Sequence, residues 1–346
     1  MLTDQRAVLL ELYAAALDAA QPGPAVTAAL AGAALQRRVH VIAIGKAARA
    51  MAAAAVSWVV TSGRELAGGV VVGADDTTPD RTIADLPFVA GDHPVPGARS
   101  VRAAAAIAAA AAAVDRRDSV LVLLSGGASS LAAAPVPGVT LEELASLNAT
   151  LLASGLDIVA MNRVRKRFLR WGAGRLAEAL APADVRCLIA SDVIGDDLTA
   201  IGSGPCAPDA ATAADIAAIL RAPPVDGRVP SAILRVLAET SAGRTVETPK
   251  PGDSAFAGVH AEIIVRNGIA LAGAAERAAA LGLSAEVATN ALTGDAATAG
   301  ALLGRALTGL DPMRCTIRGG ETTVALGDTP GRGGRCQELA LAAARE

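Results

Sequence analysis

The sequence has few aromatic side chains, little charge bias and no paired cysteines. Aromatic residues make up 2% of the 346 residues, and 31 basic residues stand against 34 acidic ones, giving a net charge of −3. Neither a basic surface nor a series of stacking side chains is therefore available for nucleic acid. No CxxC spacing occurs, which argues against a disulfide framework or a zinc site. We expect no nucleic-acid partner, and free thiols at Cys187, Cys206, Cys315 and Cys336.

Long hydrophobic runs are also missing. The alanine-rich segment 102–115 is bounded by charged residues and is too short to span a bilayer. The first twenty residues carry acids within their apolar stretch and lack a basic region followed by a cleavage site, which indicates an amphipathic helix capped by Thr3. The sequence predicts a cytoplasmic protein with no membrane partner.

Two common nucleotide-binding motifs are absent. The first apolar strand leads into GKAARA instead of GxGxxG, and GxxxxGK[ST] does not occur, so a P-loop enzyme is excluded and NAD binding lacks its diagnostic turn. His93, in GDHPVPGARS, lies between two turns where a catalytic histidine could lie. A histidine before proline more often shapes a loop, and no serine–histidine–acid triad is predicted.

Short branched-residue strands alternate with helical patterns, at 39–45, 68–73, 119–124 and 185–190. This alternation predicts a Rossmann-like doubly wound parallel sheet. Thr140 and Glu143 form a capping-box pattern, and Asp157 opens another helix. After a segment rich in proline and glycine, a second βα series begins with the strand AEIIV, which predicts a second, smaller α/β domain. The predicted domains are residues 1–245 and 246–346.

The residues that follow each strand are the candidates for chemistry, because ligands bind beyond the carboxyl ends of the strands in open α/β sheets. VLVLLSGGASSL ends a strand on Ser125-Gly126-Gly127, followed by Ser129. Such a loop either turns the chain or points backbone amides at an anion. Lys46 opens a helix, where a cation is disfavoured unless a bound phosphate shares it with the amides.

Three further stretches carry charge. Asp192, Asp196 and Asp197 lie in the glycine-rich segment 191–209, where they are either turn residues or a base with Mg²⁺ ligands. The basic helix 161–177 is usually interpreted as a solvated face. The segment 318–344 holds Gly-Gly-Glu after a strand and then a glycine-rich turn with Arg335, which could neutralise a transferring phosphoryl group.

Six motifs follow one another along nearly the whole chain: GKAA (45–48), GDHPVP (91–96), SGGASSL (125–131), MNRVRK (161–166), SDVIGDDLTAIGSGPCAPD (191–209) and GGETTV followed by GRGGRCQELALAAA (319–344). In order and spacing they resemble the glycerate 2-kinase family, ATP-dependent kinases that make 2-phosphoglycerate and are often labelled hydroxypyruvate reductases. Members combine an N-terminal Rossmann-like domain with a C-terminal MOFRL domain.

The resemblance implies ATP and Mg²⁺ as cofactors, a small hydroxy acid as substrate, and leaves a homodimer open. It implies catalytic roles for Lys46, Arg335 and Asp192. The implied cofactor-binding residues are Ser125, Gly126, Gly127, Ser129, Gly319, Gly320 and Glu321, and the implied metal ligands are Asp196 and Asp197. Two alternatives stay open, a nicotinamide-dependent hydroxypyruvate reductase and a non-catalytic remnant of the kinase fold.

The chain departs from the family pattern in ways that bear on the substrate. The departures are Arg167 for a histidine, Gly172 in place of a lysine, and Cys206 and Cys336 in place of hydrogen-bonding residues. The chain also ends at Glu346, soon after Arg335, where family members continue. We therefore expect the second domain to be incomplete.

Overall fold

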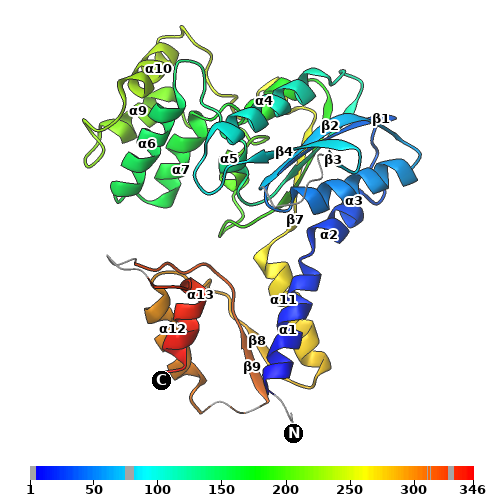
Figure 1. Cartoon of the computed structure of the whole chain (residues 1–346), viewed down its shortest axis with the longest axis vertical. Helices are drawn as coiled ribbons and strands as arrows, with labels where there is room; N and C mark the ends of the chain where they lie inside the picture. Colours follow the sequence, from blue (N-terminus) through cyan, green and yellow to red (C-terminus); the bar gives the residue numbers. More distant parts are fainter. Residues whose placement is uncertain (1–4, 75–81, 310, 312, 326–330) are drawn as a thin grey trace. The chain divides into compact units, whose positions relative to one another are not determined.

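The computed structural model describes residues 5–74, 82–309, 311, 313–325 and 331–346 (Figure 1). The chain folds as two compact units. The large unit comprises residues 22–264, and the small unit combines residues 1–21 with residues 265–346. Thr3, the predicted cap of the first helix, lies outside the described residues.

A seven-stranded sheet forms the centre of the large unit, in the order β3-β4-β2-β1-β5-β6-β7. β1 pairs in parallel with β2 and β5, β2 with β4, and β5 with β6, whereas β3 and β4 are antiparallel. The predicted doubly wound parallel sheet is confirmed. The strands are β1 (Arg38–Ile44), β2 (Glu65–Ala74), β3 (Thr82–Ile83), β4 (Leu86–Gly91), β5 (Ser119–Leu124), β6 (Asp184–Ala190) and β7 (Val259–Val265).

Helices cover both faces of this sheet, as Figure 1 shows for α3 and α4. Successive residues of a strand point to opposite faces. Val41 and Ala43 of β1 accordingly belong to one core cluster, with α2 (Pro22–Leu30) and α3 (Ala48–Thr61). Ile42 and Ile44 belong to the other cluster, with α4 (Ala98–Ala112), α5 (Ala128–Leu131) and α8 (Arg175–Leu180). Because both faces are covered, the central strands read as continuous apolar runs.

A third apolar cluster, around Phe168, is built by helices that lie together in Figure 1: α6 (Leu141–Ala153), α7 (Ile158–Arg167), α9 (Ala213–Arg221) and α10 (Ser231–Ser241). The predicted starts of two of these helices are confirmed. Thr140 and Glu143 form both bonds of a capping box at α6, and the Asp157 carboxylate accepts a bond from the Ala160 amide at α7. Single 3₁₀ turns at η1 (Ile201–Ser203) and η2 (Ser254–Phe256) complete the large unit.

The small unit is a second α/β arrangement, with α1 (Gln5–Ala19), α11 (Asn267–Ala280), β8 (Ser284–Val287), α12 (Ala296–Leu307), β9 (Arg314–Ile317) and α13 (Arg335–Ala343). β8 and β9 pair in parallel. α13 packs on α12 at Gly300 and Gly304, where a Cβ would lie 2.2 Å from the Leu339 carbonyl oxygen and 2.4 Å from that of Ala343. Within the described residues, no helix has the length and apolarity needed to cross a membrane.

The structure differs from the expectation at the strand AEIIV. The sequence pattern predicts this strand in the second domain, but it forms β7 in the seven-stranded sheet. The Val185 amide donates to the Gly258 carbonyl at the start of the strand. The proline-rich segment before it therefore ends inside the large unit. The division into domains at residue 245 stays a prediction.

Candidate active site

Two hydrogen bonds connect the loops that follow β1 and β5 at the carboxyl edge of the large sheet. The Lys46 amide donates to the Gly126 carbonyl at 2.9 Å, and the Ala47 amide donates to Ser125 Oγ at 3.0 Å. Gly45 has a φ of +130°, and a Cβ there would lie 2.2 Å from Ser125 Oγ. Only glycine allows this approach, which fixes the exposed Lys46 beside the Ser-Gly-Gly loop.

Charged and polar side chains converge on Gly126 and Gly127. A Cβ on Gly126 would lie 2.0 Å from Asp192 Oδ2. Gly127 is left-handed, with a φ of +83°, and a Cβ there would lie 3.3 Å from Lys46 Cε and 3.1 Å from His93 Cδ2. The loops after β1, β4, β5 and β6 thus bring a cation, an imidazole and a carboxylate to two adjacent glycines. We call Lys46, His93, Gly126, Gly127 and Asp192 the loop cluster.

A serine pair links the loop after β5 to the loop after β6. Ser129 Oγ and Ser203 Oγ are 2.7 Å apart. Gly202, Ser203 and Gly204 are all left-handed, with φ values of +58°, +68° and +61°. A left-handed serine is uncommon and costs of the order of 1 kcal/mol, so the surroundings must hold it. The amide of Ala173 does so by donating to the Ser203 carbonyl at 2.8 Å.

His93 is the member of the loop cluster that sequence reasoning did not select. Burial lowers its pKa from the ordinary value of 6.5, the positive charge of Lys46 lowers it further, and Asp192 opposes the shift. The available signal was its position after an apolar stretch, the expected place for a ligand-binding residue. The strand itself was not predicted, because Pro87 lies inside it and proline argues against a central strand.

Asp196 and Asp197 lie in the same loop as Asp192 but are arranged as turn residues. Asp196 is left-handed, with a φ of +55°. The Asp197 carboxylate accepts bonds from the Thr199 amide at 2.8 Å and the Thr199 hydroxyl at 3.1 Å. In the part of the chain that the structure describes, no three histidine, cysteine or acidic side chains gather as a metal site. Mg²⁺ often binds through one or two carboxylates and substrate phosphates, so metal binding here stays a prediction.

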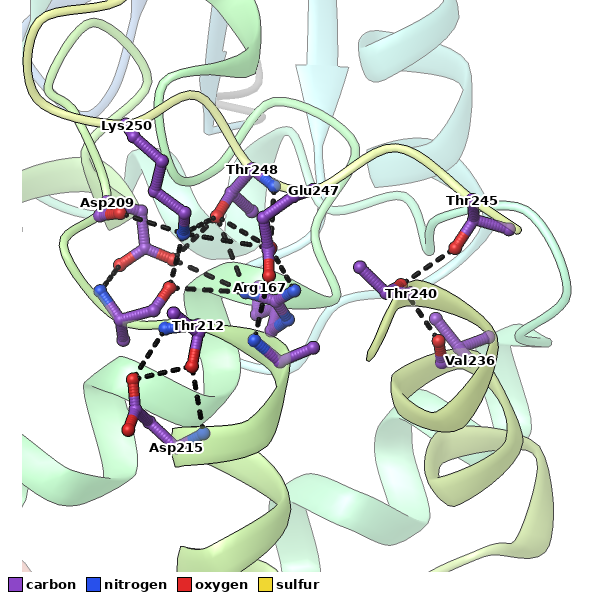
Figure 2. Close-up of polar contacts among 12 residues, drawn as sticks. Arg167, Asp209, Thr212, Asp215, Val236, Thr240, Thr245, Glu247, Thr248 and Lys250 are labelled. Atoms are coloured by element: carbon purple, nitrogen blue, oxygen red, sulfur yellow. Dashed lines mark hydrogen bonds and ion pairs between the residues drawn. The ribbon is translucent and has the colours of Figure 1, made fainter. Parts of the chain in front are cut away.

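The basic helix α7 does not carry a fully solvated face. Lys166 and Arg167 are only 6% and 4% exposed. Lys166 Nζ lies 3.0 Å from Asp209 Oδ1. Arg167 pairs with Asp209 and with Glu247, as Figure 2 shows. The interpretation as a solvated face is wrong for these two residues, because carboxylates 40 to 80 positions away in the sequence neutralise them.

The same network holds the segment that leads to β7. Lys250 Nζ donates to the Thr248 hydroxyl at 2.8 Å, and that hydroxyl donates to Asp209 Oδ2 at 3.1 Å (Figure 2). Burial would raise the pKa of Glu247, but bonds from the Ala213 and Thr248 amides and from Arg167 lower it to about 2. Arg167 therefore has a structural role in this network, whatever the substrate.

Two of the other departures from the family pattern, Gly172 and Cys206, lie in closely packed positions. At Gly172 a Cβ would lie 2.3 Å from the Lys166 carbonyl oxygen, so a side chain does not fit without a shift. Cys206 is buried beside Cys187, and a bond between the two thiols together with burial raises the pKa of Cys187 well above the ordinary range. Cys336 is exposed, and all four cysteines are free.

The remaining predicted site residues lie in the small unit. Arg335 is the first residue of α13, and its Nη2 lies 2.7 Å from Glu321 Oε1, with both side chains about half exposed. Gly320 has a φ of +148°, and a Cβ there would lie 2.2 Å from the Leu292 carbonyl oxygen. A Cβ on the neighbouring Gly319 would meet the Asn267 side chain. The structure thus forms two groups of predicted site residues, one in each unit.

Comparison with known proteins defines the class. Residues 8–238 match a family described as "Domain of unknown function (DUF4147)". The chain is 33% identical to a D-glycerate 2-kinase of Thermotoga maritima, over 97% of this chain and 78% of the relative. It is 38% identical to an Agrobacterium vitis protein named as a hydroxypyruvate reductase, over 98% of this chain and 76% of the relative.

A solved structure agrees with these relatives. The crystal structure of glycerate kinase from Thermotoga maritima superposes with a TM-score of 0.84 at 33% identity, covering 98% of this chain and 79% of that one. The fold and the relatives together define an α/β kinase. The chain belongs to the glycerate 2-kinase family.

Proposed function

We propose that this protein is a glycerate 2-kinase, which transfers the terminal phosphoryl group of ATP to the 2-hydroxyl of D-glycerate with Mg²⁺. The observation that carries the proposal is the loop cluster at the carboxyl edge of the sheet. Parallel α/β sheets bind ligands at that edge, and here it holds a lysine whose charge no described carboxylate neutralises in an ion pair. The relatives named glycerate kinase support the choice of substrate.

The residues present fit a phosphate chain. The amides of Gly126 and Gly127 donate no hydrogen bond to another described residue, whereas the adjacent Ser125 amide donates to Ile44. Free amides in a glycine loop and a nearby ammonium group are the donors that phosphate oxygens need. Lys46 would neutralise the charge that develops on the transferring group, and the glycines would admit the phosphate to the backbone.

Phosphoryl transfer asks the protein for positioning and charge neutralisation more than for covalent chemistry. Arg335 of the small unit would supply a second cation, oriented by Glu321. The proposed cofactor-binding residues are Ser125 and Ser129 in the large unit and Gly319 and Gly320 in the small unit. Bound Mg²⁺ would draw negative charge from the phosphates, with Asp196 and Asp197 as the predicted ligands and Asp192 as the predicted catalytic carboxylate.

The alternative reading as a nicotinamide-dependent reductase has less support. β1 leads into Gly45-Lys46-Ala47, which lacks the three-glycine turn that receives a dinucleotide pyrophosphate. The reductase reading rests on the names that some relatives carry. The cytoplasmic location and the homodimer stay predictions.

A coupled assay separates the three readings. Purified full chain is incubated with ATP, Mg²⁺ and D-glycerate while ADP release is followed, and a parallel reaction contains NADH and hydroxypyruvate. We expect ADP release that depends on glycerate, with no NADH consumption. NADH consumption without ADP release would exclude the kinase, and ATP binding without either turnover would favour a non-catalytic remnant.

A further inference from the structure

The backbone that carries His93 is held on both sides. At Gly91, the last residue of β4, a Cβ would lie 2.0 Å from the Leu131 carbonyl oxygen, so the strand end packs directly on the end of α5. On the other side, Asp92 accepts bonds from the Arg99 amide at 2.9 Å and from Arg99 Nε at 2.6 Å. These contacts fix the backbone next to His93. A catalytic group needs such support, because it must be positioned within a fraction of an ångström.

The imidazole lies over the same glycine as the end of the Lys46 side chain. From the position that a Cβ of Gly127 would take, His93 Nε2 is 3.3 Å away and Lys46 Cε is also 3.3 Å away. His93 is exposed as a residue, although neighbouring atoms desolvate part of its ring, so a bound molecule can still reach the imidazole. An anion that contacts Lys46 and the Gly127 backbone would have His93 beside it.

The charges around His93 favour its neutral form. Lys46 faces it from the loop after β1 and Asp192 from the loop after β6, while Asp92 on its own loop is paired with Arg99. Burial and the charge of Lys46 keep the pKa below 6.5, against the opposing effect of Asp192. A neutral imidazole at pH 7 has one ring nitrogen free to accept a proton.

We propose that His93 is a further catalytic residue, the group that accepts the proton of the substrate hydroxyl during transfer. The inference rests on the proposed kinase function. The hydroxyl oxygen of the hydroxy acid forms a bond to the terminal phosphorus of ATP, and the bond from that phosphorus to the bridging oxygen breaks. ADP leaves with the electron pair, and the hydroxyl proton moves to His93 Nε2. The negative charge of Asp192, over the neighbouring Gly126, then stabilises the imidazolium that forms.

The kinetic test compares His93→Gln with His260→Gln. His260 lies exposed on β7, which makes its replacement a matched control. General base catalysis contributes typically 10²- to 10⁴-fold, so we expect His93→Gln to lower kcat by about 10²-fold while the control keeps wild-type activity. We also expect the acidic limb of kcat/KM, below neutral pH, to shrink in His93→Gln. The terminal phosphate of ATP ionises in the same range, but equally for all three enzymes.

A spectroscopic test reads the same geometry without turnover. The chain has only three histidines, His40, His93 and His260, so ¹⁵N-histidine spectra can be assigned by substitution. Lys46→Met should raise the midpoint of the His93 titration and Asp192→Asn should lower it, while the His260 midpoint stays unchanged. A structural role for His93 would lower the melting temperature of His93→Gln but leave the acidic limb in place.

The outcomes separate this inference from the proposed function. Wild-type chain that releases no ADP would remove the kinase and with it the reaction assigned to His93. Active wild type together with a His93→Gln variant that keeps its kcat and its acidic limb would overturn the role of His93 alone. A limb that persists in His93→Gln and disappears only in Asp192→Asn would transfer the role to Asp192.

Discussion

In the large unit, β5 is buried along its whole length and β1 along all but its first residue, whereas in the small unit no residue of β8 is fully buried. α13, which begins with Arg335, has no buried residue either. The two units alternate strands and helices in the same way but bury them to different depths. The loop cluster therefore follows strands that are buried in a large core, whereas the Arg335–Glu321 pair lies among elements with little buried surface.

The largest expected effect comes from removing the cation of the loop cluster. Lys46→Met should lower kcat by about 10²-fold, because losing one well-placed donor to transition-state charge costs about 3 kcal/mol. The melting temperature should stay near that of wild type, since the side chain is exposed. Arg37→Met, an exposed cation just before the other end of β1, is the control. An unaltered kcat in Lys46→Met would identify the lysine as a solvated loop residue.

The second effect concerns the cation of the small unit. Arg335→Met should lower kcat by a similar factor if it serves the same phosphoryl group as Lys46. The double variant should then lose less than the product of the two single losses, because residues that act as a unit are not additive. Glu321→Gln, which only removes the partner of Arg335, should have a smaller effect. Fully multiplicative losses in the double variant would mean that the two cations act on separate steps.

The third effect is on stability and compares the two cores directly. Leu123→Ala, in the fully buried β5, should lower the free energy of unfolding by about 3 kcal/mol, because it leaves a cavity in a close-packed core. Leu283→Ala, in the small cluster with Leu12 and Ala278, should cost less, since fewer neighbours surround it. Leu302→Ala, on the exposed face of α12, is the surface control. Urea unfolding followed by circular dichroism measures all three. Equal losses of unfolding free energy in Leu123→Ala and Leu283→Ala would contradict the difference between the two cores.

The smallest effect is a pH dependence in the network around Arg167. The folded-state pKa of Glu247, about 2, lies below the ordinary value of 4.5. The carboxylate therefore stabilises the fold above pH 4.5, and this contribution is lost as the pH falls from 4.5 towards 2. Glu247→Gln should be less stable than wild type at pH 7, and the difference should narrow as the pH falls from 4.5 towards 2. Urea midpoints that differ by the same amount at every pH would contradict this assignment.

Local sequence patterns were sufficient for much of the fold. Continuous apolar runs predicted the buried strands β1 and β5 within one residue, and the Thr140–Glu143 pattern predicted the start of α6. Such signals lie within one segment and follow from burial and capping alone. The same patterns also predicted that Lys46, Ser125 and Asp192 follow strand ends, where the structure brings their loops together.

What the sequence could not supply depends on contacts between distant segments. The basic residues of α7 have the same pattern whether water or a carboxylate faces them, and Asp209 and Glu247 are remote in sequence. β7 has a strand pattern that suits either domain, and only its pairing assigns it to the large sheet. The segment around His93 indicates only a loop, because its neighbours Lys46 and Asp192 come from other strand ends.

Product analysis by ³¹P NMR tests the central claim most directly. Wild-type chain is incubated with ATP, Mg²⁺ and D-glycerate, and the spectrum is recorded with proton coupling retained. A phosphate ester at carbon 2 couples to one methine proton and gives a doublet, whereas an ester at carbon 3 couples to two protons and gives a triplet. We expect a doublet that grows as ADP appears and that is almost absent with Lys46→Met. A triplet, or ATP consumption with no ester signal, would contradict the assignment as a glycerate 2-kinase.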